Sequence, residues 1–179
     1  MPANKIKTSA SHTFDEPTGL IYNHVTPLGI TRITEQDGFI VSILVMDEGE
    51  PSHHIAGTAT QLAIKQLDEY FEGKRLSFDL PLKPEGTTFQ QLVWQQLQAI
   101  PYGKCITYLH QARLMNSPLA IRAIAAANGK NKLWIVVPCH RVIGSSGKLT
   151  GYAGGLWRKK WLLEHEARII GSGQISLGL

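Results

Sequence analysis

The chain has 179 residues and is 43% hydrophobic, so it is long enough to bury a core as one domain or as two small ones. It contains no run of about 18 apolar residues, which excludes a transmembrane helix, and its first residues lack the apolar stretch of a signal peptide. The net charge of +4 is unevenly placed, because residues 1–85 carry 7 Lys and Arg against 12 Asp and Glu, or −5, whereas residues 86–179 carry 11 against 2, or +9.

This division of charge suggests that the second half of the chain contacts a polyanion such as nucleic acid. The alternative is that the basic residues only form a solvated surface. The two cysteines, Cys105 and Cys139, could pair, but without an export signal free thiols in a reducing cytoplasm are favoured. We therefore expect a cytoplasmic protein, associated with the nucleoid if it is prokaryotic, that does not bind membranes.

The first part of the chain has the pattern of an arm followed by a small sheet. Residues 1–20 are polar and rich in Ser and Thr, which predicts a flexible N-terminal arm. From residue 21 to residue 46, three short β-type runs alternate with turn signals at Pro27–Gly29 and Asp37–Gly38. This alternation predicts an antiparallel sheet.

A helix and a linker follow the predicted sheet. In residues 59–74 the apolar side chains of Leu62, Leu67, Tyr70 and Phe71 stand at helical spacing and Gly73 follows them, which predicts a helix that ends there. Residues 83–86, KPEG, are typical of a linker. The predicted domains are therefore an N-terminal α/β domain at 21–84, a C-terminal domain at 85–170 and a tail at 171–179.

The basic half begins with a second amphipathic helix. Thr87 and Gln90 have the spacing of a capping box at its start, and Pro101–Gly103 ends it. The face predicted to be buried consists of Phe89, Leu92, Val93 and Leu97. A short strand is predicted next, over residues 105–108.

The following segment has the pattern of a helix-turn-helix. A helix is predicted from about His110 to Met115, then a tight turn at 116–118 and a second helix over 119–129. Alanines keep the second helix thin, so that its backbone can approach a partner closely, and Arg122 is the one long basic side chain in its body. The same pattern also fits an ordinary αα-hairpin, and alanines favour helix in any context.

The segment IVVPCHRVIG places a cysteine directly after an apolar run. The run, residues 135–137, predicts a strand that delivers Cys139 to the end of a sheet, since Pro138 cannot donate to the ladder. At that position His140 could act as a base and Arg141 could favour the thiolate, which makes the cysteine a candidate nucleophile. The alternative is an inert core cysteine, the commoner use of a thiol in an apolar run.

The cysteines and histidines do not have the spacing of a metal site. Cys139 and His140 are adjacent, without a spacing that would direct both at one ion, and Cys105 lies in its own apolar strand. The histidines with no cysteine near them are His24, His53 and His54. We therefore predict no metal and no other cofactor.

Residues 136–166, VVPCHRVIGSSGKLTGYAGGLWRKKWLLEHE, resemble the signature region of the O6-alkylguanine-DNA alkyltransferases, also called methylated-DNA–protein-cysteine methyltransferases. The Pro-Cys-His-Arg-Val core is highly specific to that family. The resemblance extends over roughly 87–167 and continues weakly into the first half, where TPLG (26–29) opens the first hairpin. It implies an α/β (α+β) fold, with a ribonuclease-H-like antiparallel sheet and helix followed by a mostly helical domain that contains the helix-turn-helix.

The resemblance implies direct-reversal repair of double-stranded DNA, with O6-alkylguanine as the substrate and O4-alkylthymine as a second candidate. Cys139 corresponds to the thiol that accepts the alkyl group, His140 to the residue that deprotonates it through a water, and Glu166 to the carboxylate that orients the histidine. The thioether product has no good leaving group, so each chain would react once. No obligate protein partner is implied.

The resemblance also implies residues that hold the DNA and the damaged base. Asn131 resembles the hinge residue that ties the recognition helix to the active site, and Tyr108 the residue that protonates the departing guanine and crowds the 3′ phosphate. Arg122 resembles the finger that fills the gap left by the flipped base, on a minor-groove helix that also carries Ala123. The positions that match the base pocket are Val142, Ser145, Tyr152 and Ala153.

The sequence departs from the family pattern at three positions near the predicted site. Lys132 follows Asn131 where relatives usually carry proline, and Ala125 stands where glycine is common. Trp134 occupies a place commonly held by a smaller residue, and it would restrict bulky adducts if it faces the pocket.

Three other functions fit part of the pattern. A sensor that binds alkylated guanine without repairing it would not need the intact Cys139. A Cys-His-Glu hydrolase would share the nucleophile and base, but it would turn over and would have no use for a minor-groove helix. A plain helix-turn-helix regulator usually dimerises on two half-sites and has no use for the Pro-Cys-His-Arg motif.

Overall fold

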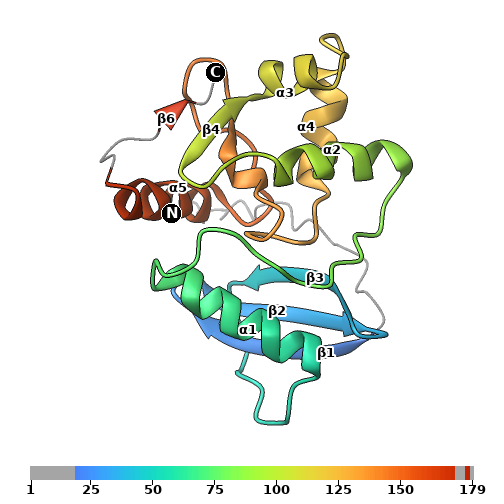
Figure 1. Ribbon diagram of the computed structural model, residues 1–179, viewed down its shortest axis with the longest axis vertical. Helices are drawn as coiled ribbons and strands as arrows, with labels where there is room; N and C mark the ends of the chain where they lie inside the picture. The colour runs from blue at the N-terminus through green and yellow to red at the C-terminus, as the bar shows by residue number, and fades with distance from the viewer. Residues whose placement is uncertain (1–18, 172–175, 178–179) are drawn as a thin grey trace, which may run out of the picture.

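The computed structural model describes residues 19–171 and 176–177. Most of the arm predicted over 1–20 and of the tail predicted over 171–179 therefore lies outside the described residues. The chain forms two lobes, an antiparallel sheet with a helix and a second lobe made mostly of helices (Figure 1). This arrangement confirms the predicted fold class.

The first lobe is built on a three-stranded antiparallel sheet in the order β1-β2-β3. Its strands are β1 (Leu20–Thr26), β2 (Gly29–Gln36) and β3 (Phe39–Met46). Both connecting turns lie where they were predicted. In the second turn Asp37 (φ 51°) and Gly38 (φ 79°) both adopt left-handed backbone conformations, as a two-residue type I′ hairpin requires.

Helix α1 (Thr58–Phe71) covers one face of this sheet (Figure 1). Its N-terminus is capped from another element, because the buried carboxylate of Glu35 on β2 accepts hydrogen bonds from the backbone N and the hydroxyl of Thr60, both at 2.8 Å. Of the apolar residues that stand at helical spacing, Leu67 and Tyr70 are buried, whereas Leu62 is 39% exposed. The residues that the helix buries are Ala59, Thr60, Ala63, Gln66, Leu67 and Tyr70.

The second lobe combines helices with a short parallel sheet in the order β5-β4-β6. Its helices are α2 (Thr88–Gln98), α3 (Tyr108–Leu114), α4 (Ile121–Gly129) and α5 (Leu156–Ile169). Its strands are β4 (Lys104–Thr107), β5 (Val142–Ile143) and β6 (Ser176–Leu177).

Helix α2 starts with the predicted capping box. The Thr87 hydroxyl accepts from the Gln90 backbone N at 3.2 Å, and the Gln90 side chain accepts from the Thr87 backbone N at 2.9 Å. The predicted apolar face is only partly buried, because Phe89 is 38% and Leu92 51% exposed, while Trp94, which was not predicted to belong to it, is buried with Val93 and Leu97. The indole of Trp94 faces α4, where its Nε1 donates to the carbonyl of Ala127 at 2.8 Å.

Helices α3 and α4 form the predicted helix-turn-helix. Helix α3 begins at Tyr108, two residues earlier than predicted, because the Thr107 hydroxyl accepts from the backbone N of His110 at 3.0 Å and caps the helix there. The two helices are locked together by buried amides, with Asn128 Nδ2 donating to Gln111 Oε1 at 2.8 Å. The face of α4 that points away from this contact stays open to solvent.

The apolar run 135–137 is not a strand, contrary to the prediction from the sequence. It forms a buried turn in which Ile135 has φ 72°, and the chain then enters a 3-10 helix, η1 (Cys139–Arg141). The backbone N of Cys139 donates to the carbonyl of Val137 at 2.8 Å within this turn. The run is apolar because it is packed between the two lobes, and a short apolar run does not distinguish a strand from other buried backbone.

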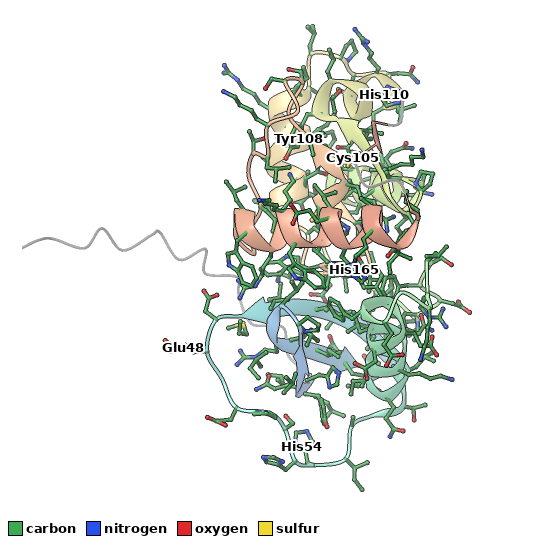
Figure 2. The ribbon with its side chains drawn as sticks, turned by 90° about the vertical axis from the view of Figure 1, so that its left-hand side faces the viewer. Glu48, His54, Cys105, Tyr108, His110 and His165 are labelled. Atoms are coloured by element: carbon green, nitrogen blue, oxygen red, sulfur yellow. The ribbon has the colours of Figure 1, made fainter. Side chains whose placement is uncertain are left out.

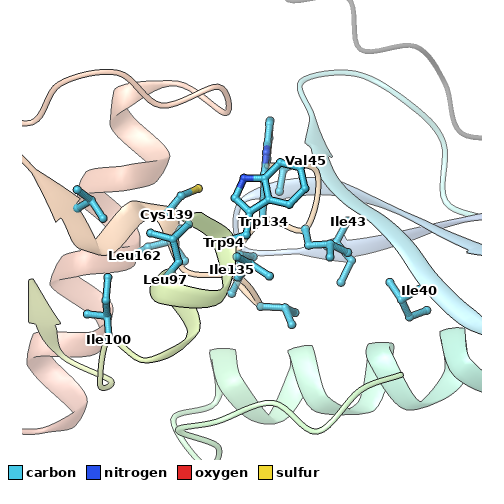
Figure 3. Packing of buried hydrophobic residues seen from close by; sticks show 14 of the residues in the cluster. Ile40, Ile43, Val45, Trp94, Leu97, Ile100, Trp134, Ile135, Cys139 and Leu162 are labelled. Carbon is cyan, nitrogen blue, oxygen red and sulfur yellow. The ribbon is translucent and has the colours of Figure 1, made fainter. Parts of the chain in front are cut away.

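The cysteine turn is also attached to the sheet of the first lobe. The backbone N of Ile43 donates to the carbonyl of Lys132 at 2.7 Å, and the backbone N of Trp134 donates to the carbonyl of Ile43 at 3.0 Å. Figure 3 shows the apolar core running from one lobe to the other through Ile40, Ile43, Ile135, Leu97 and Leu162. The turn that carries Cys139 therefore rests on both lobes.

Helix α5 crosses the molecule between the two lobes, with His165 on the side of the sheet lobe (Figure 2). At its start Arg158 is buried and donates to the carbonyl of Leu28 at 3.0 Å and to Asp47 Oδ1 at 2.7 Å. Near its end His165 Nε2 donates to the carbonyl of Tyr70 at 3.0 Å. Helix α5 is thus bonded to the first lobe near both of its ends.

Candidate active site

The thiol of Cys139 lies in a buried and polar environment at the start of η1. The side chain is 7% exposed, and Asn131 Nδ2 donates a hydrogen bond to its Sγ at 3.2 Å. Burial raises the pKa of the Cys139 thiol, and the hydrogen bond from Asn131 and the charge of Lys159 oppose this rise only in part. The resting group is therefore a thiol, which needs a base before it can act as a nucleophile.

The next residue, His140, is wholly buried and is paired with Glu166. His140 Nε2 lies 2.8 Å from Glu166 Oε1. Burial would raise the pKa of Glu166, but the contacts with His140 and Arg141 outweigh it and hold this pKa well below its usual range. Because an ionised carboxylate only accepts hydrogen bonds, the proton on the ring must be on Nε2, and Nδ1 carries the lone pair.

The free lone pair of His140 is in the right state to accept a proton. Burial lowers the pKa of His140, with Glu166 opposing the shift, so the ring is neutral at pH 7. Its Nδ1 is buried and has no hydrogen-bond partner among the residues that the structure describes. A buried nitrogen of this kind, next to a protonated thiol in the chain, is a candidate general base.

The carboxylate of Glu166 accepts hydrogen bonds from four residues, His140, Arg141, Gly103 and Tyr70, which lie in three segments of the chain. Arg141 donates hydrogen bonds to both oxygens, from Nε to Oε2 at 3.0 Å and from Nη2 to Oε1 at 3.0 Å. The backbone N of Gly103 donates to Oε2 at 2.9 Å, and the Tyr70 hydroxyl donates to Oε1 at 2.8 Å. The guanidinium of Arg141 is therefore engaged by the carboxylate, and not by the thiol that it was expected to favour.

A buried lysine completes the group of charges around the thiol. Lys159 on α5 is wholly buried, and its Nζ donates to the carbonyls of Val142 at 2.6 Å and Thr150 at 2.9 Å. Burial lowers the pKa of Lys159 to about 8, which leaves it mostly charged at pH 7. Its ammonium lies 5.8 Å from the centre of the Tyr108 ring. Lys159 supplies the positive charge that was expected of Arg141.

A cavity of about 610 Å³ opens between α4 and the segment 150–153. It brings together four of the predicted site residues, namely Tyr108, Arg122, Tyr152 and Ala153. The Tyr108 hydroxyl donates to the carbonyl of Thr150 at 3.3 Å across it. Burial raises the pKa of Tyr108, so the phenol keeps its proton at neutral pH.

Seven of the eleven predicted site residues do not line this cavity, namely the buried Cys139, His140, Glu166 and Asn131, and the three residues Val142, Ala123 and Ser145. Val142 is buried and contributes its carbonyl to Lys159, while Ala123 and Ser145 are exposed. Trp134 is buried, and its ring packs 5.7 Å from that of Tyr152, while its Nε1 donates to the carbonyl of Asn131 at 2.8 Å. Trp134 thus supports one wall of the cavity from behind.

Sequence reasoning did not identify Lys159 and Tyr70 as part of the site. One signal pointed to Lys159, because it precedes Glu166 by seven positions, about two helical turns, and so lies on the same face of α5. Nothing local pointed to Tyr70, which is 96 positions from the carboxylate that it contacts. It was interpreted only as one apolar residue of a helix face.

The described part of the chain contains no group of three or more His, Cys, Asp and Glu side chains that could hold a metal ion. No described helix is long and apolar enough to cross a membrane.

Comparison with known proteins connects this geometry to one family. Residues 24–84 match the family model described as 6-O-methylguanine DNA methyltransferase, ribonuclease-like domain. Residues 88–168 match the model described as 6-O-methylguanine DNA methyltransferase, DNA binding domain.

Individual relatives agree with the family models. The chain is 42% identical over 147 residues to a methylated-DNA–protein-cysteine methyltransferase of Mycolicibacterium paratuberculosis, with 80% of this chain and 89% of that protein covered. It is 42% identical over 152 residues to the constitutive enzyme of that name from Bacillus subtilis, with 80% and 92% covered. The crystal structure of the Mycobacterium tuberculosis O6-methylguanine methyltransferase in complex with DNA superposes with a TM-score of 0.76 at 39% identity, covering 83% of this chain and 93% of that one.

Proposed function

The chain belongs to the methylated-DNA–protein-cysteine methyltransferase family, and from this premise we propose that it repairs DNA by moving the alkyl group of O6-alkylguanine onto its own Cys139. The observation that carries the proposal is the array of Cys139, His140 and Glu166, in which a buried thiol is followed by a neutral histidine with a free Nδ1 and a fixed Nε2–H. Only the first of these residues changes covalently.

The reaction begins with removal of the thiol proton. The Nδ1 of His140 accepts it, relayed by a water, and the imidazolium that forms is stabilised by the ionised Glu166. The thiolate is stabilised by the hydrogen bond from Asn131 and by the charge of Lys159. Burial raises the pKa of the Cys139 thiol, so the thiolate is a strong nucleophile once it has formed.

The transfer is a single in-line displacement. The sulfur of Cys139 forms a bond to the alkyl carbon while the bond from that carbon to O6 breaks, and the electron pair leaves with the guanine. Tyr108 donates a proton to the departing base. The raised pKa of Tyr108 keeps this phenol protonated until that step. The product is a thioether, so the chain accepts one alkyl group and does not turn over.

The base must leave the DNA stack before the sulfur can reach it, which costs a few kcal/mol. In this proposal helix α4 lies in the minor groove of the DNA. Ala123 contacts the DNA backbone there, and Arg122 fills the gap that the flipped base leaves in the base stack. The flipped base enters the cavity against Tyr152 and Ala153. Val142 and Ser145, which the resemblance also assigns to the base pocket, do not line the cavity in this structure. Because the second half carries the positive charge, affinity should fall by roughly 0.9 log units per tenfold salt for each phosphate contacted.

The same proposal covers the remaining expectations from the sequence. Residues 21–84 and 85–170 act as the two domains, and the second one holds the DNA. The partner is double-stranded DNA containing alkylated guanine, with O4-alkylthymine as a second candidate substrate and no obligate protein partner. The protein acts in the cytoplasm, in keeping with its two free thiols.

The test is incubation with a short duplex that contains one O6-methylguanine, followed by the intact mass of the protein. We expect the mass to rise by one methyl group and no further, and peptide mapping to place the group on Cys139. Cys139→Ala should bind the duplex and gain no mass, whereas Cys105→Ala should behave as the wild type. Binding without a mass change in the wild type would indicate a sensor, and release of more than one equivalent of product would indicate a hydrolase.

A further inference from the structure

The first lobe contributes one side chain to the charges behind the active site. Tyr70, in the last turn of α1, is wholly buried, and its hydroxyl donates to Glu166 Oε1 at 2.8 Å. This is the oxygen that also accepts from His140 Nε2 at 2.8 Å. Tyr70 and His140 therefore share one carboxylate oxygen from opposite lobes.

We propose that Tyr70 is a positioning residue of the alkyl-transfer site, whose hydroxyl limits how much of the negative charge of Glu166 acts on His140. The inference rests on the proposed function, because it takes His140 as the base. It assigns a part in the chemistry to the lobe that does not carry the thiol.

The donor is fixed in direction. The Tyr70 ring packs against Tyr102 and Phe71 with centroids 5.7 Å and 5.4 Å apart, and against Phe78 at 5.5 Å. Its backbone carbonyl accepts from His165 Nε2 at 3.0 Å, which ties the end of α1 to α5. The hydroxyl oxygen cannot move to another acceptor unless this aromatic cluster moves.

The donor is also permanent. Burial, followed by the charge of Glu166, raises the pKa of Tyr70 well above its usual value, so the hydroxyl stays protonated at every pH at which the protein works. It therefore donates to Oε1 before and after His140 takes up a proton. A constant donor on one oxygen reduces the charge that this oxygen can offer to the imidazolium.

The other groups around the pair set the background against which Tyr70 acts. Six titratable side chains from neighbouring elements face Glu166, His140 or Tyr70. They are Arg141 on η1, Cys105 on β4, Tyr102 in the turn before β4, and Lys159, His165 and Arg168 on α5. None of these is altered when the hydroxyl of Tyr70 alone is removed. The change in the charge on Oε1 can then be attributed to the missing donor.

The test is Tyr70→Phe, with the single-turnover rate of methyl transfer measured at saturating duplex across pH. Without the donor, Glu166 stabilises the imidazolium more strongly, so His140 becomes more basic and stays protonated to higher pH. We expect the acid limb of the rate profile to move to higher pH by about half a unit to one unit. The dissociation constant for the duplex should not change.

Tyr102→Phe is the matched control. It removes the same atom from the adjacent ring, and the Tyr102 hydroxyl has no hydrogen-bond partner within the described ranges. This variant should keep the wild-type profile. An equal shift in both variants, or a lower melting temperature for Tyr70→Phe with an unchanged profile, would show that Tyr70 only packs the core and would overturn the inference.

A second variant covers the case in which Tyr70→Phe does not fold. Tyr70→fluorotyrosine keeps the hydroxyl and the shape of the ring but makes the phenol a stronger donor, so the acid limb should move to lower pH. No movement would overturn the inference. The wild type and Tyr102→Phe report on the proposed function separately, because failure of both to methylate Cys139 would contradict that function and not the role of Tyr70.

Discussion

The side-chain amide of Asn131 joins the end of the helix-turn-helix to the reactive sulfur, because its Nδ2 donates to Cys139 Sγ at 3.2 Å. The same nitrogen donates to the carbonyl of Val137 at 2.8 Å, and the amide oxygen accepts from the backbone N of Leu133 at 2.9 Å. One side chain thus holds both the turn before the cysteine and the thiol itself. A change in the conformation of the turn that follows α4 would therefore change the hydrogen bond to the sulfur.

Asn131→Ala should destabilise the protein and slow methyl transfer. The backbone N of Leu133 would lose its acceptor inside the protein, which lowers the free energy of unfolding by about 1–3 kcal/mol. Loss of the donor to the thiolate should slow transfer about tenfold or more, since a hydrogen bond to a charged group contributes about 1.5–3 kcal/mol. Urea unfolding and single-turnover rates measure the two effects.

Asn131→Asp separates those two effects. The carboxylate keeps an acceptor for the backbone N of Leu133 but presents an oxygen, and no donor, to the sulfur. We expect it to be slower in transfer than Asn131→Ala. A wild-type rate in the Asp variant would remove the amide donor from the mechanism.

Glu166→Gln should slow transfer and destabilise the protein at neutral pH. The buried guanidinium of Arg141 would lose its counter-charge, which costs about 3–5 kcal/mol in the free energy of unfolding. The control is Glu164→Gln on the same helix, whose exposed carboxylate forms only a 3.6 Å pair with Lys160 and should change stability by less than about 0.5 kcal/mol. Equal effects in the two variants would contradict the structural role of Glu166.

The pH dependence of stability should carry the signature of Glu166. Its pKa is held well below the usual range in the folded protein, so its contribution is fully present above the unfolded value of about 4.3 and is lost as pH falls below it. Urea unfolding of the wild type should therefore weaken steeply below about pH 4. Glu166→Gln should lack this part of the acid loss, because its amide does not titrate. A parallel acid loss in the two proteins would assign it to other carboxylates.

Lys159→Met should slow transfer about tenfold, equivalent to about 1.4 kcal/mol, because the thiolate of Cys139 would lose the positive charge that favours it. Since burial lowers the pKa of Lys159 to about 8, the wild type loses this charge as pH rises. The ratio of the wild-type rate to the variant rate should therefore fall toward one as pH rises through about 8. Lys160→Met, next to it but exposed, should match the wild type throughout. A ratio that is constant with pH would mean that Lys159 only packs.

Arg122→Lys should slow repair in duplex DNA and leave reaction with the free base O6-methylguanine unchanged. Arg122 is exposed at the rim of the cavity, and a planar guanidinium can stack and bond to the orphaned partner base in a way that lysine cannot. Placing the lesion opposite an abasic gap, where unstacking costs less, should restore part of the rate. Equal slowing on free base and duplex would mean that Arg122 supports the pocket and does not enter the stack.

Local rules predicted the parts of the fold that local interactions decide. The Asp37–Gly38 turn and the Thr87–Gln90 capping box both lie where their residue types indicated, because each depends on atoms within four positions. The run 135–137 was wrongly predicted to be a strand, because its conformation depends on residues that are distant in the sequence. Its conformation is set by packing between two lobes, which includes a bond from Trp134 to Ile43, and no local pattern encodes that contact.

The candidate site divides in the same way. The thiol, the histidine and the carboxylate could be named because they lie within one motif of 31 residues that resembles a known family. Tyr70 could not, because its contact with Glu166 spans 96 positions and uses the polar end of a residue that otherwise packs as a hydrophobe. Lys159 was not predicted to belong to the site because lysines are rarely buried, whereas this one is wholly buried.

The bonds that join α5 to the first lobe have a consequence for how the protein unfolds. Arg158 reaches Leu28 across 130 positions and His165 reaches Tyr70 across 95, so the last long helix closes contacts with the beginning of the chain. If the sheet lobe opened alone, the buried guanidinium of Arg158 would lose Leu28 and Asp47, and the carboxylate of Glu166 would lose Tyr70, which is costly. The two lobes should therefore melt in one cooperative transition, and slowly exchanging amides in β3 and α5 should report the same free energy of opening.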